Sequence, residues 1–344
     1  MKKRILVAGG TGYIGSHTVV ELQNSGYEVI IVDNLSNSRA DVVDSIEQIT
    51  GIRPAFEKVD CLDYEGMDAV FAKYPGIEGI IHFAASKAVG ESVQKPLLYY
   101  RNNLVSLINI LELMPKHGVK GIIFSSSCTV YGQPDVLPVT EAAPIKKAES
   151  PYGNTKQINE EIIDDTIASG SPIKAIKLRY FNPIGAHPSA LIGELPNGVP
   201  QNLVPFLTQT AMGIREKLSV FGDDYDTPDG SCIRDYIYVV DLAKAHVIAM
   251  NRILEGKQKQ ASEVFNVGTG RGLSVLELIK AFESSTGVKL NYQIAPRRAG
   301  DIVKVWADPS YANNELGWKA DTSIEDTLRS AWNWQVHLRE KGIM

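Results

Sequence analysis

Arg4-Ile-Leu-Val-Ala-Gly-Gly-Thr-Gly-Tyr-Ile-Gly15 is the stretch of this sequence that decides its fold. A short apolar run leads straight into spaced glycines, and a helical stretch follows up to Ser25. A second apolar run, Glu28–Val32, comes next and ends at Asp33. A strand, a glycine-rich turn, a helix and a second strand within about 30 residues form a βαβ unit, which is typical of parallel sheets.

The glycines and Asp33 have the spacing of a dinucleotide-binding turn. Gly9 permits the tight turn, Gly12 lets the backbone approach a pyrophosphate, and Gly15 lets the helix pack closely on the sheet. The helix N-terminus attracts the anion. Asp33 can accept a hydrogen bond from a ribose 2′-hydroxyl and would repel a 2′-phosphate, so the sequence favours NAD over NADP, although Arg39 lies nearby.

The alternation of strands and helices continues as far as residue 180. Strands alternating with helices predict a parallel, doubly wound (Rossmann) α/β sheet. Pro115 is expected to kink or end the predicted helix at 97–114. The expected strands are 55–59, 79–83, 121–125 and 173–178, and the expected helices are 40–50, 64–74, 97–114 and 152–169.

The sequence changes character after Arg179, because residues 181–200 are rich in proline and glycine. We predict loops at 181–200 and 221–235, helices at 202–212 and 241–255, and a strand at 264–267. Ser274-Val-Leu-Glu277 and Thr322-Ser-Ile-Glu325 are capping boxes that open two further helices. We therefore expect two domains, a Rossmann domain at 1–180 and a smaller α/β domain at 181–344.

The totals are those of an ordinary globular protein. The chain has 344 residues, 44% hydrophobic and 22% charged, with a formal net charge of -5. No long basic run suggests a nucleic-acid partner, and no apolar stretch approaches the ~20 residues that cross a bilayer. Cys61, Cys128 and Cys232 form no CxxC pair, and the histidines show no metal-ligand spacing. We expect a cytoplasmic, metal-free protein without nucleic-acid or membrane partners.

Tyr152-Gly-Asn-Thr-Lys156 places a phenol and an amine about one helical turn apart, on one face. A phenol is a poor base near neutral pH, since its unperturbed pKa is about 10. A nearby ammonium favours the phenolate and lowers that pKa. The pair is therefore a plausible device for moving a proton on and off a hydroxyl, although the same spacing also occurs on ordinary surface helices.

Ser125-Ser126-Ser127 ends an expected strand, and ligands of such sheets bind beyond the carboxyl ends of strands. A hydroxyl there can bond a substrate oxygen. For Ser125 and Ser126 we favour the simpler interpretation that they satisfy backbone groups. Residues that follow other strand ends, or lie on adjacent helical turns, are candidates for adenine and ribose contacts: Asp60, Phe83, Ala84 and Asn102.

These residues together resemble the extended short-chain dehydrogenase/reductase family over essentially the whole chain. The resemblance depends on Gly9-x-x-Gly12-x-x-Gly15, Ser127 and Tyr152-x-x-x-Lys156. Within the family, the chain is similar to the branch that inverts C4 of UDP-hexoses. Further matching segments are 82–92, 99–103, 125–132, 179–187, 221–225, 234–239 and 295–301.

The resemblance implies an NAD-dependent enzyme in which the C4 hydride passes to the nicotinamide and returns to the other face of a 4-keto sugar. Tyr152 would take the O4 proton, Ser127 would orient O4, and Lys156 would hold the nicotinamide ribose. Domain 1–180 would bind NAD, and the family suggests a homodimer through the helices that begin near Leu97 and Tyr152. The implied cofactor site is Gly9, Gly12, Tyr13, Ile14, Gly15, Asp33, Asn34, Asn37, Ser38, Asp60, Cys61, Phe83, Ala84, Ala85, Lys87, Asn102, Ser125, Tyr152, Lys156 and Tyr180.

The resemblance also implies that domain 181–344 holds the UDP end of the sugar while the sugar ring turns. Arg234 and Arg298 suit a diphosphate, because guanidinium groups pair with its oxygens. Asp301 suits ribose hydroxyls, and Phe221 can pack on uracil. The implied substrate site is Ser127, Tyr152, Phe181, Asn182, Asn202, Leu203, Phe221, Arg234, Arg298, Asp301 and Val305.

Two alternatives remain open. One is another nucleotide-sugar enzyme of the same fold, such as a 4,6-dehydratase, a decarboxylase or a UDP-glucuronate 4-epimerase. Dehydratases place an Asp-Glu pair after the catalytic Ser or Thr, whereas Cys128-Thr129 stands here. The other is a regulator that binds a dinucleotide without catalysis; such proteins commonly lose the Tyr or the Lys, and both are present here.

Val305 is the residue from which we predict the substrate range. In family members restricted to UDP-glucose and UDP-galactose, a large tyrosine often stands at this position beside C2 of the sugar. Valine would leave room for an N-acetyl group, which predicts activity on UDP-GlcNAc and UDP-GalNAc as well. The alternative is that Val305 only packs within a strand.

Overall fold

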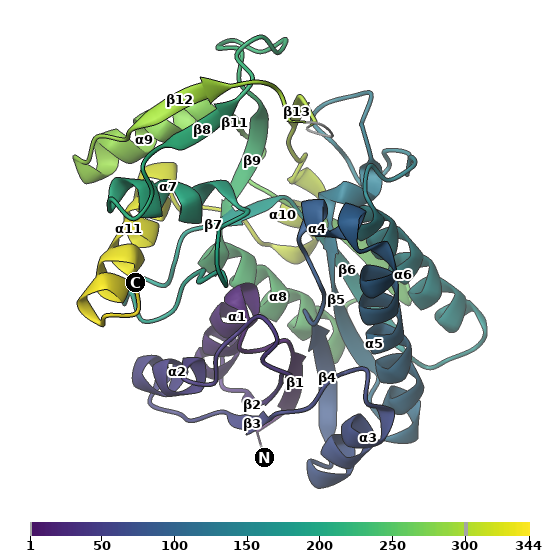
Figure 1. Ribbon diagram of the computed structural model, residues 1–344. Coiled ribbons are helices and arrows are strands. Elements are labelled where there is room, and N and C mark those ends of the chain that lie inside the picture. Colours follow the sequence, from purple (N-terminus) through teal and green to yellow (C-terminus); the bar gives the residue numbers. More distant parts are fainter. Residues whose placement is uncertain (1, 299–301) are drawn as a thin grey trace.

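A seven-stranded parallel sheet forms the centre of the computed structural model, which describes residues 2–298 and 302–344 (Figure 1). Its strand order is β10-β6-β5-β4-β1-β2-β3, so the predicted doubly wound α/β sheet is confirmed. The order reverses between β1 and β4, and ligands of such sheets bind at the carboxyl edge near that reversal. The strands are β1 (Arg4–Ala8), β2 (Glu28–Val32), β3 (Ala55–Glu57), β4 (Ile77–His82), β5 (Gly121–Ser127), β6 (Lys174–Tyr180) and β10 (Ser262–Val267).

Helices cover both faces of this sheet, because successive strand residues point to opposite sides. Ile5 and Val7 pack in one apolar cluster with α1, α2 and α8, whereas Leu6 and Ala8 pack in another with α3, α5 and α6. Pro115 lies in the last turn of α5, which ends one residue later. The helices are α1 (Tyr13–Asn24), α2 (Val42–Thr50), α3 (Tyr64–Lys73), α4 (Val89–Gln94), α5 (Pro96–Lys116), α6 (Pro151–Ala168) and α8 (Val239–Leu254).

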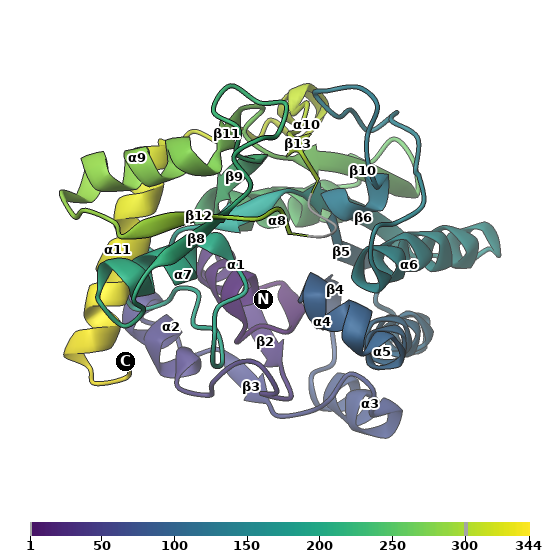
Figure 2. The same cartoon turned by 45° about the horizontal axis from the view of Figure 1, so that its top comes forward.

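A second group of elements lies to one side of the sheet, with its own apolar cluster (Figures 1 and 2). Strand β9 pairs with β7, β11 and β13, and β8 pairs with β12. The remaining elements are β7 (Asn182–Ile184), α7 (Leu203–Ala211), β8 (Leu218–Phe221), β9 (Ile233–Tyr238), β11 (Gly272–Ser274), α9 (Val275–Thr286), β12 (Tyr292–Ala295), β13 (Lys304–Val305), α10 (Ser310–Leu316), α11 (Ile324–Glu340) and the 3-10 helix η1 (Cys128–Tyr131).

The expected division after residue 180 does not follow the central sheet. Strand β10 pairs along its length with β6, and α8 packs against α1 and three strands of the sheet. Both elements come from the part of the chain assigned to the second domain. We therefore propose that residues 239–267 belong to the Rossmann unit and that the chain passes between the two units more than once.

Several local predictions of secondary structure need correction. The expected loop at 181–200 contains strand β7. Strands β8 and β9 overlap the two ends of the expected loop at 221–235. The capping box at Ser274 is confirmed, with Glu277 as its partner. The last helix is capped by Ser323, which accepts from the Asp326 amide, rather than by Thr322. Within the described residues, no helix combines the length and apolarity needed to cross a membrane.

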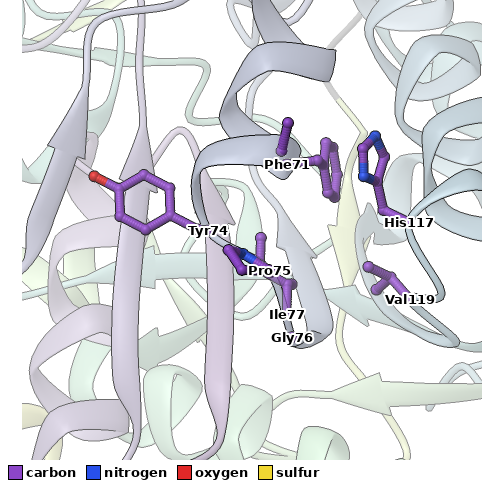
Figure 3. Close-up of a pocket in the computed structure, with 8 residues that line it drawn as sticks. Phe71, Tyr74, Pro75, Gly76, Ile77, His117 and Val119 are labelled. Carbon is purple, nitrogen blue, oxygen red and sulfur yellow. The ribbon is translucent and has the colours of Figure 1, made fainter.

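A hollow of about 300 Å³ lies between the end of α3 and the end of α5 (Figure 3). Phe71 and His117 stack with their ring centroids 5.2 Å apart, and Ile77 and Val119 line the hollow where β4 and β5 begin. The amino ends of these strands therefore border the hollow, whereas Ser127 stands at the opposite, carboxyl edge of the sheet.

Three buried histidines make the stability of the fold depend on pH. Burial lowers the pKa of His17 and His82 to about 3 and that of His246 to about 4, from 6.5. One ring nitrogen of each has no hydrogen-bond partner among the described residues. At these three positions the unfolded chain binds more protons than the folded protein between about pH 4 and 6.5, so the stability that the neutral histidines contribute is lost as the pH falls through this window.

We predict that the free energy of unfolding decreases from pH 6.5 to 5 by up to about 1.4 kcal/mol per pH unit for each of these histidines. Urea denaturation at several pH values measures the slope. His246→Asn keeps a donor for the Leu242 carbonyl, which lies 2.9 Å from His246 Nδ1, and removes the titration. This variant should show a shallower slope, and an unchanged slope would contradict the assignment.

Candidate active site

The carboxyl edge of the sheet brings together most of the residues predicted for the site. Ser127 ends β5, Tyr180 ends β6, and Asp33 and Phe83 directly follow β2 and β4. Tyr152 is the second residue of α6, which Ser150 caps by accepting from the Gly153 amide. Local sequence thus places the phenol at a helix start, facing the end of the neighbouring strand.

The glycine turn forms a tight cradle between β1 and α1. Gly9 has a φ of 80°, which favours glycine, and a Cβ on Gly15 would lie 2.2 Å from the Gly9 carbonyl oxygen. A Cβ on Gly12 would lie 3.2 Å from the same oxygen. The bare backbone leaves the start of α1, at Tyr13 and Ile14, accessible to an anion, which fits the pyrophosphate of a dinucleotide.

The Asp33 carboxylate lies beside this cradle. It accepts from the Thr11 amide at 3.2 Å, and from the Leu35 amide and the Ser38 hydroxyl at 2.9 Å. Arg39, the residue that left the choice of dinucleotide open, pairs with Asp41 at 2.6 Å on the surface. Among the residues that the structure describes, no guanidinium forms an ion pair with this carboxylate, which fits a ribose hydroxyl better than a 2′-phosphate.

The expected adenine side of the cradle is a compact group of loops. Asn34 donates to the Asp60 carboxylate at 2.9 Å, and the Phe83 and Ala84 amides both donate to the Ala8 carbonyl. Cys61 is buried, and burial raises the pKa of its thiol to about 12. Asn37 is exposed and Ala85 half-buried on neighbouring loops.

A hydrogen-bond centre that the sequence did not reveal holds the next loop in place. Asn103 is buried on α5, accepts from the Ser86 amide at 2.8 Å, and donates to the Ser86 carbonyl and to Thr155 of α6. Its neighbour Asn102, the residue we predicted, donates to the Ser86 hydroxyl at 3.1 Å. Adjacent asparagines on one helix were the only signal in the sequence.

Glu194 is a second residue that sequence reasoning missed. Its carboxylate accepts from Lys87 at 3.1 Å and from Asn202 at 2.6 Å. Lys87 also lies 5.8 Å from the Tyr13 ring centroid. The Glu194 carboxylate thus joins a residue of the predicted cofactor site to a residue of the predicted substrate site. A single Glu in a long loop forms no sequence pattern from which this contact could be inferred.

Ser127, Tyr152 and Lys156 form a cluster in which Ser127 and Lys156 are buried and Tyr152 is half-buried. A hydrogen bond joins the Ser127 hydroxyl to the Tyr152 phenol, and Lys156 Nζ lies 5.8 Å from the centroid of the phenol ring. The ammonium donates to the Ser125 carbonyl at 2.5 Å and lies 4.9 Å from the Phe124 ring centroid. The spacing of Tyr152 and Lys156 therefore does bring the two groups to one face of α6.

Burial controls the titration of this cluster. It raises the pKa of the Tyr152 phenol above its usual range, and the hydrogen bond to Ser127 only partly opposes this. Burial also lowers the pKa of Lys156 to about 8, against the influence of Glu160. The expectation of a lowered tyrosine pKa is thus wrong for the protein alone, because desolvation of a buried phenolate outweighs one ammonium that is bonded to a carbonyl.

The expectation for the neighbouring serines is also wrong. Ser125 hydrogen-bonds the Tyr180 hydroxyl, and Ser126 donates to the Glu160 carboxylate at 2.5 Å, so their hydroxyls serve side chains rather than backbone groups. Burial raises the pKa of Tyr180 to about 12. The reason is the alternation along β5, which points Ser125 and Ser126 to opposite faces of the sheet, each toward a polar partner.

The residues predicted for the UDP end are spread over the second group of elements. Asn182 lies in β7, Asn202 and Leu203 begin α7, and Arg234 in β9 donates to the Ile233 carbonyl. Phe221 ends β8 with 40% of its surface exposed, and the Arg298 guanidinium lies 5.6 Å from its ring centroid. Phe181 and Val305 are buried in one apolar cluster. Asp301 lies outside the described residues.

Comparison with known proteins agrees with this geometry. The family model described as GDP-mannose 4,6 dehydratase matches residues 6–331. A UDP-glucose 4-epimerase of Bacillus subtilis (strain 168) is 51% identical over 331 residues, covering 96% of both chains. The chain belongs to the extended short-chain dehydrogenase/reductase family, the class that the fold and the Ser-Tyr-Lys cluster define. Within that family, the relatives that are 46–51% identical over nearly the whole chain include UDP-glucose 4-epimerases.

Two solved structures are similar over nearly their whole length. A UDP-glucose 4-epimerase from Stenotrophomonas maltophila, with bound NAD and formylated UDP-arabinopyranose, has a TM-score of 0.95, 47% identity and coverage of 98% of this chain and 99% of that one. The enzyme from Bifidobacterium longum, in complex with NAD+ and UDP, has a TM-score of 0.93, 49% identity and coverage of 97% and 98%.

Proposed function

We propose that this chain is an NAD-dependent epimerase that inverts C4 of UDP-hexoses, interconverting UDP-glucose and UDP-galactose. The observation that carries the proposal is the cluster of Ser127, Tyr152 and Lys156 at the same edge of the sheet as a glycine turn in which Gly9 and Gly15 leave no space for a Cβ. When bound there, NAD supplies a reversible acceptor for hydride. The relatives reported above, and their bound NAD and UDP compounds, support this assignment.

The side chains of the cluster then have separate tasks. Tyr152 takes the proton from O4 and later returns it, and Ser127 orients O4 through the same hydroxyl that bonds the phenol. Lys156 holds its positive charge near the phenol, and a second positive charge, on the oxidised cofactor, would further favour the phenolate. Residues 34, 60, 83 and 84 would face the adenosine end, with the Asp33 carboxylate on a ribose.

The nucleotide end of the substrate needs an anchor that stays fixed while the sugar turns. Arg234 and Arg298 would pair with the diphosphate, and exposed Phe221 would pack on the uracil ring. Asn182, Asn202 and Leu203 lie on the same group of elements and complete the proposed site.

We predict that the purified protein converts UDP-galactose to UDP-glucose without added cofactor, because a closed redox cycle gains nothing by releasing NAD. Tyr152→Phe should lower kcat at least about 100-fold while UDP binding stays intact, since the ring remains and the proton acceptor is lost. Lys156→Ala should weaken both rate and cofactor retention. The measurements are a coupled assay and analysis of the dinucleotide released on denaturation.

Tyr27→Phe is the matched control, since its hydroxyl bonds Asn251 at the far side of the sheet. It should keep normal turnover. The proposed function fails if the wild-type protein converts no UDP-hexose and carries no dinucleotide, and the role of Tyr152 fails if Tyr152→Phe turns over normally.

Val305 lies close to the catalytic strand end, which supports its proposed role in substrate range. It packs with Val130, Phe181 and Ala307, and Cys128, the residue after Ser127, packs against the same cluster. Its short side chain would leave room for an N-acetyl group beside the sugar.

We therefore predict that the enzyme also interconverts UDP-GlcNAc and UDP-GalNAc, and that Val305→Tyr selectively suppresses this second reaction. Overfilling a pocket excludes the larger ligand first. Val305→Ile is the control, because it adds one methylene and no ring. Steady-state rates with both sugar pairs test the idea, and a wild-type enzyme inactive on UDP-GlcNAc but active on UDP-glucose would refute it.

We also propose a homodimer through the helices α4, α5 and α6. Apolar side chains on α4 and α5 face outward, with Val93 62%, Leu97 82% and Leu98 49% exposed. Such a patch is rarely left uncovered on a monomer, and a self-complementary patch on a helix pair suits a two-fold axis.

Sedimentation velocity should show a dimer for the wild-type protein and a shift toward monomer for Leu97→Glu. Ile145→Glu places the same charge on an exposed apolar residue elsewhere and should leave the dimer intact. A monomeric wild type, or equal sedimentation of both variants, would overturn the proposal.

The proposed place of action is the cytoplasm. Cys61, Cys128 and Cys232, all within the described residues, are free thiols, as is usual in a reducing compartment. Fractionation of cells that express the protein natively tests this, and recovery in a secreted fraction would contradict it.

A further inference from the structure

A row of buried polar side chains crosses three strands directly behind Ser127. Ser126 of β5 is paired with Arg179 of β6, and Arg179 is paired with Asn266 of β10. None of the three is more than 6% exposed. By the alternation along each strand, they lie on the face of the sheet that α6 covers. Uncompensated polar groups there would be costly, so the row has to be bonded internally.

Glu160 of α6 completes the row. Its carboxylate accepts from the Ser126 hydroxyl at 2.5 Å and from Arg179 at 2.9 and 2.5 Å. Arg179 also donates to the Tyr131 hydroxyl at 3.0 Å, and that hydroxyl donates to Asn266 at 2.7 Å. Glu160 and Arg179 therefore each make several directional hydrogen bonds in addition to neutralising each other's charge. These bonds hold the two side chains in one geometry.

The far end of the row is anchored as well. The Asn266 side-chain amide donates to the Val139 carbonyl at 2.9 Å, and the Asn266 backbone N–H donates to the Glu141 carboxylate at 2.6 Å. Val139 in turn bridges to Ala307, two residues after Val305. The row therefore connects the catalytic strand end to the segment proposed to border the sugar.

Of the two residues that flank Ser126, Ser127 belongs to the proposed catalytic cluster and Ser125 contacts it. The Ser125 carbonyl accepts from Lys156, and the Ser127 hydroxyl bonds Tyr152. Glu160 stands one helical turn beyond Lys156 on the same helix, so a single carboxylate ties the strand to the helix between the two contacts. A shift at Ser126 would move both contacts at once.

We propose that Ser126, Glu160 and Arg179 are positioning residues, which fix the end of β5 against α6 and thereby hold Ser127 and Lys156 in register with Tyr152. The inference depends on the proposed epimerisation, since that reaction gives the cluster its task. Removing the ties leaves the UDP anchor untouched, because that anchor lies on other elements. It therefore affects the chemical step and leaves UDP binding unchanged.

Ser126→Ala tests the proposal with the smallest change, as it deletes one hydroxyl. We expect kcat for UDP-galactose to fall at least about tenfold, because small displacements of reacting groups are costly. The dissociation constant for UDP, measured by calorimetry, and the melting temperature should remain close to those of the wild type. A wild-type kcat in Ser126→Ala would overturn the proposal.

Glu160→Gln provides a second test, and the chain supplies a matched control. Glu263 forms a bidentate buried pair with Arg252, at 2.7 and 3.0 Å, between α8 and β10. Both Glu→Gln variants leave a buried arginine without its full partner, so both should melt at lower temperature. Only Glu160→Gln should lower kcat with little change in KM.

Equal kcat values for the two folded Gln variants would refute the positioning role. A general loss of activity in proportion to the drop in melting temperature would also refute it, since that is what a purely structural pair predicts. Inactivity of the wild-type protein would instead overturn the proposed function, so the two failures are distinguishable within one set of assays.

Discussion

The close approach of Gly15 to the Gly9 carbonyl is the constraint on which the rest of the site depends. A Cβ at Gly15 would lie 2.2 Å from that oxygen, so α1 can begin directly against the end of β1 only if position 15 lacks a side chain. Position 9 favours glycine for a different reason, because its φ is 80° and a Cβ there would lie 2.8 Å from the Ala84 amide nitrogen. This approach places a helix N-terminus at the point where the strand order reverses, where a phosphate is favoured by both the dipole and the free amides. The loops that follow β2 and β4 close around the same point.

In the proposed catalytic cluster, the fold itself disfavours the charged forms of the side chains. Burial raises the pKa of Tyr152 and lowers that of Lys156, which disfavours the charged form of each. A dry site strengthens every charge interaction within it, so a positive ligand placed near the phenol has far more effect here than it would in water. The protein alone holds the phenol ready but neutral, and the activating charge is expected to come with the cofactor. A phenol that is neutral in the protein alone, and that would ionise more easily beside a positive charge, is suited to take up a proton and later return it.

Features that depend on contacts between residues close together in the chain were predicted correctly from the sequence. The ends of β1 and β2 were predicted correctly, as were the capping box at Ser274 and the helix that carries Tyr152 and Lys156. The partners of Glu194, Ser126 and Asn103 could not be predicted, since each contact joins segments far apart in the chain and no spacing rule connects them. The return of β10 to the central sheet was missed for the same reason. The apolar pattern of a six-residue strand indicates that the strand is buried, but it does not indicate which sheet the strand joins.

That return of the chain also limits how the molecule can move during turnover. Strand β10 is bonded to β6 along its whole length, and Asp235 of β9 accepts from Thr269, just beyond β10, and from Ala307, just beyond β13. A rigid rotation of the elements proposed to bind UDP away from the sheet would break these buried contacts, and buried hydrogen bonds are expensive to leave unmade. The inversion of C4 requires the two faces of a sugar to meet one fixed cofactor. With the frame held in this way, the proposed mechanism requires the sugar to turn, while the diphosphate would stay on Arg234 and Arg298 as proposed above.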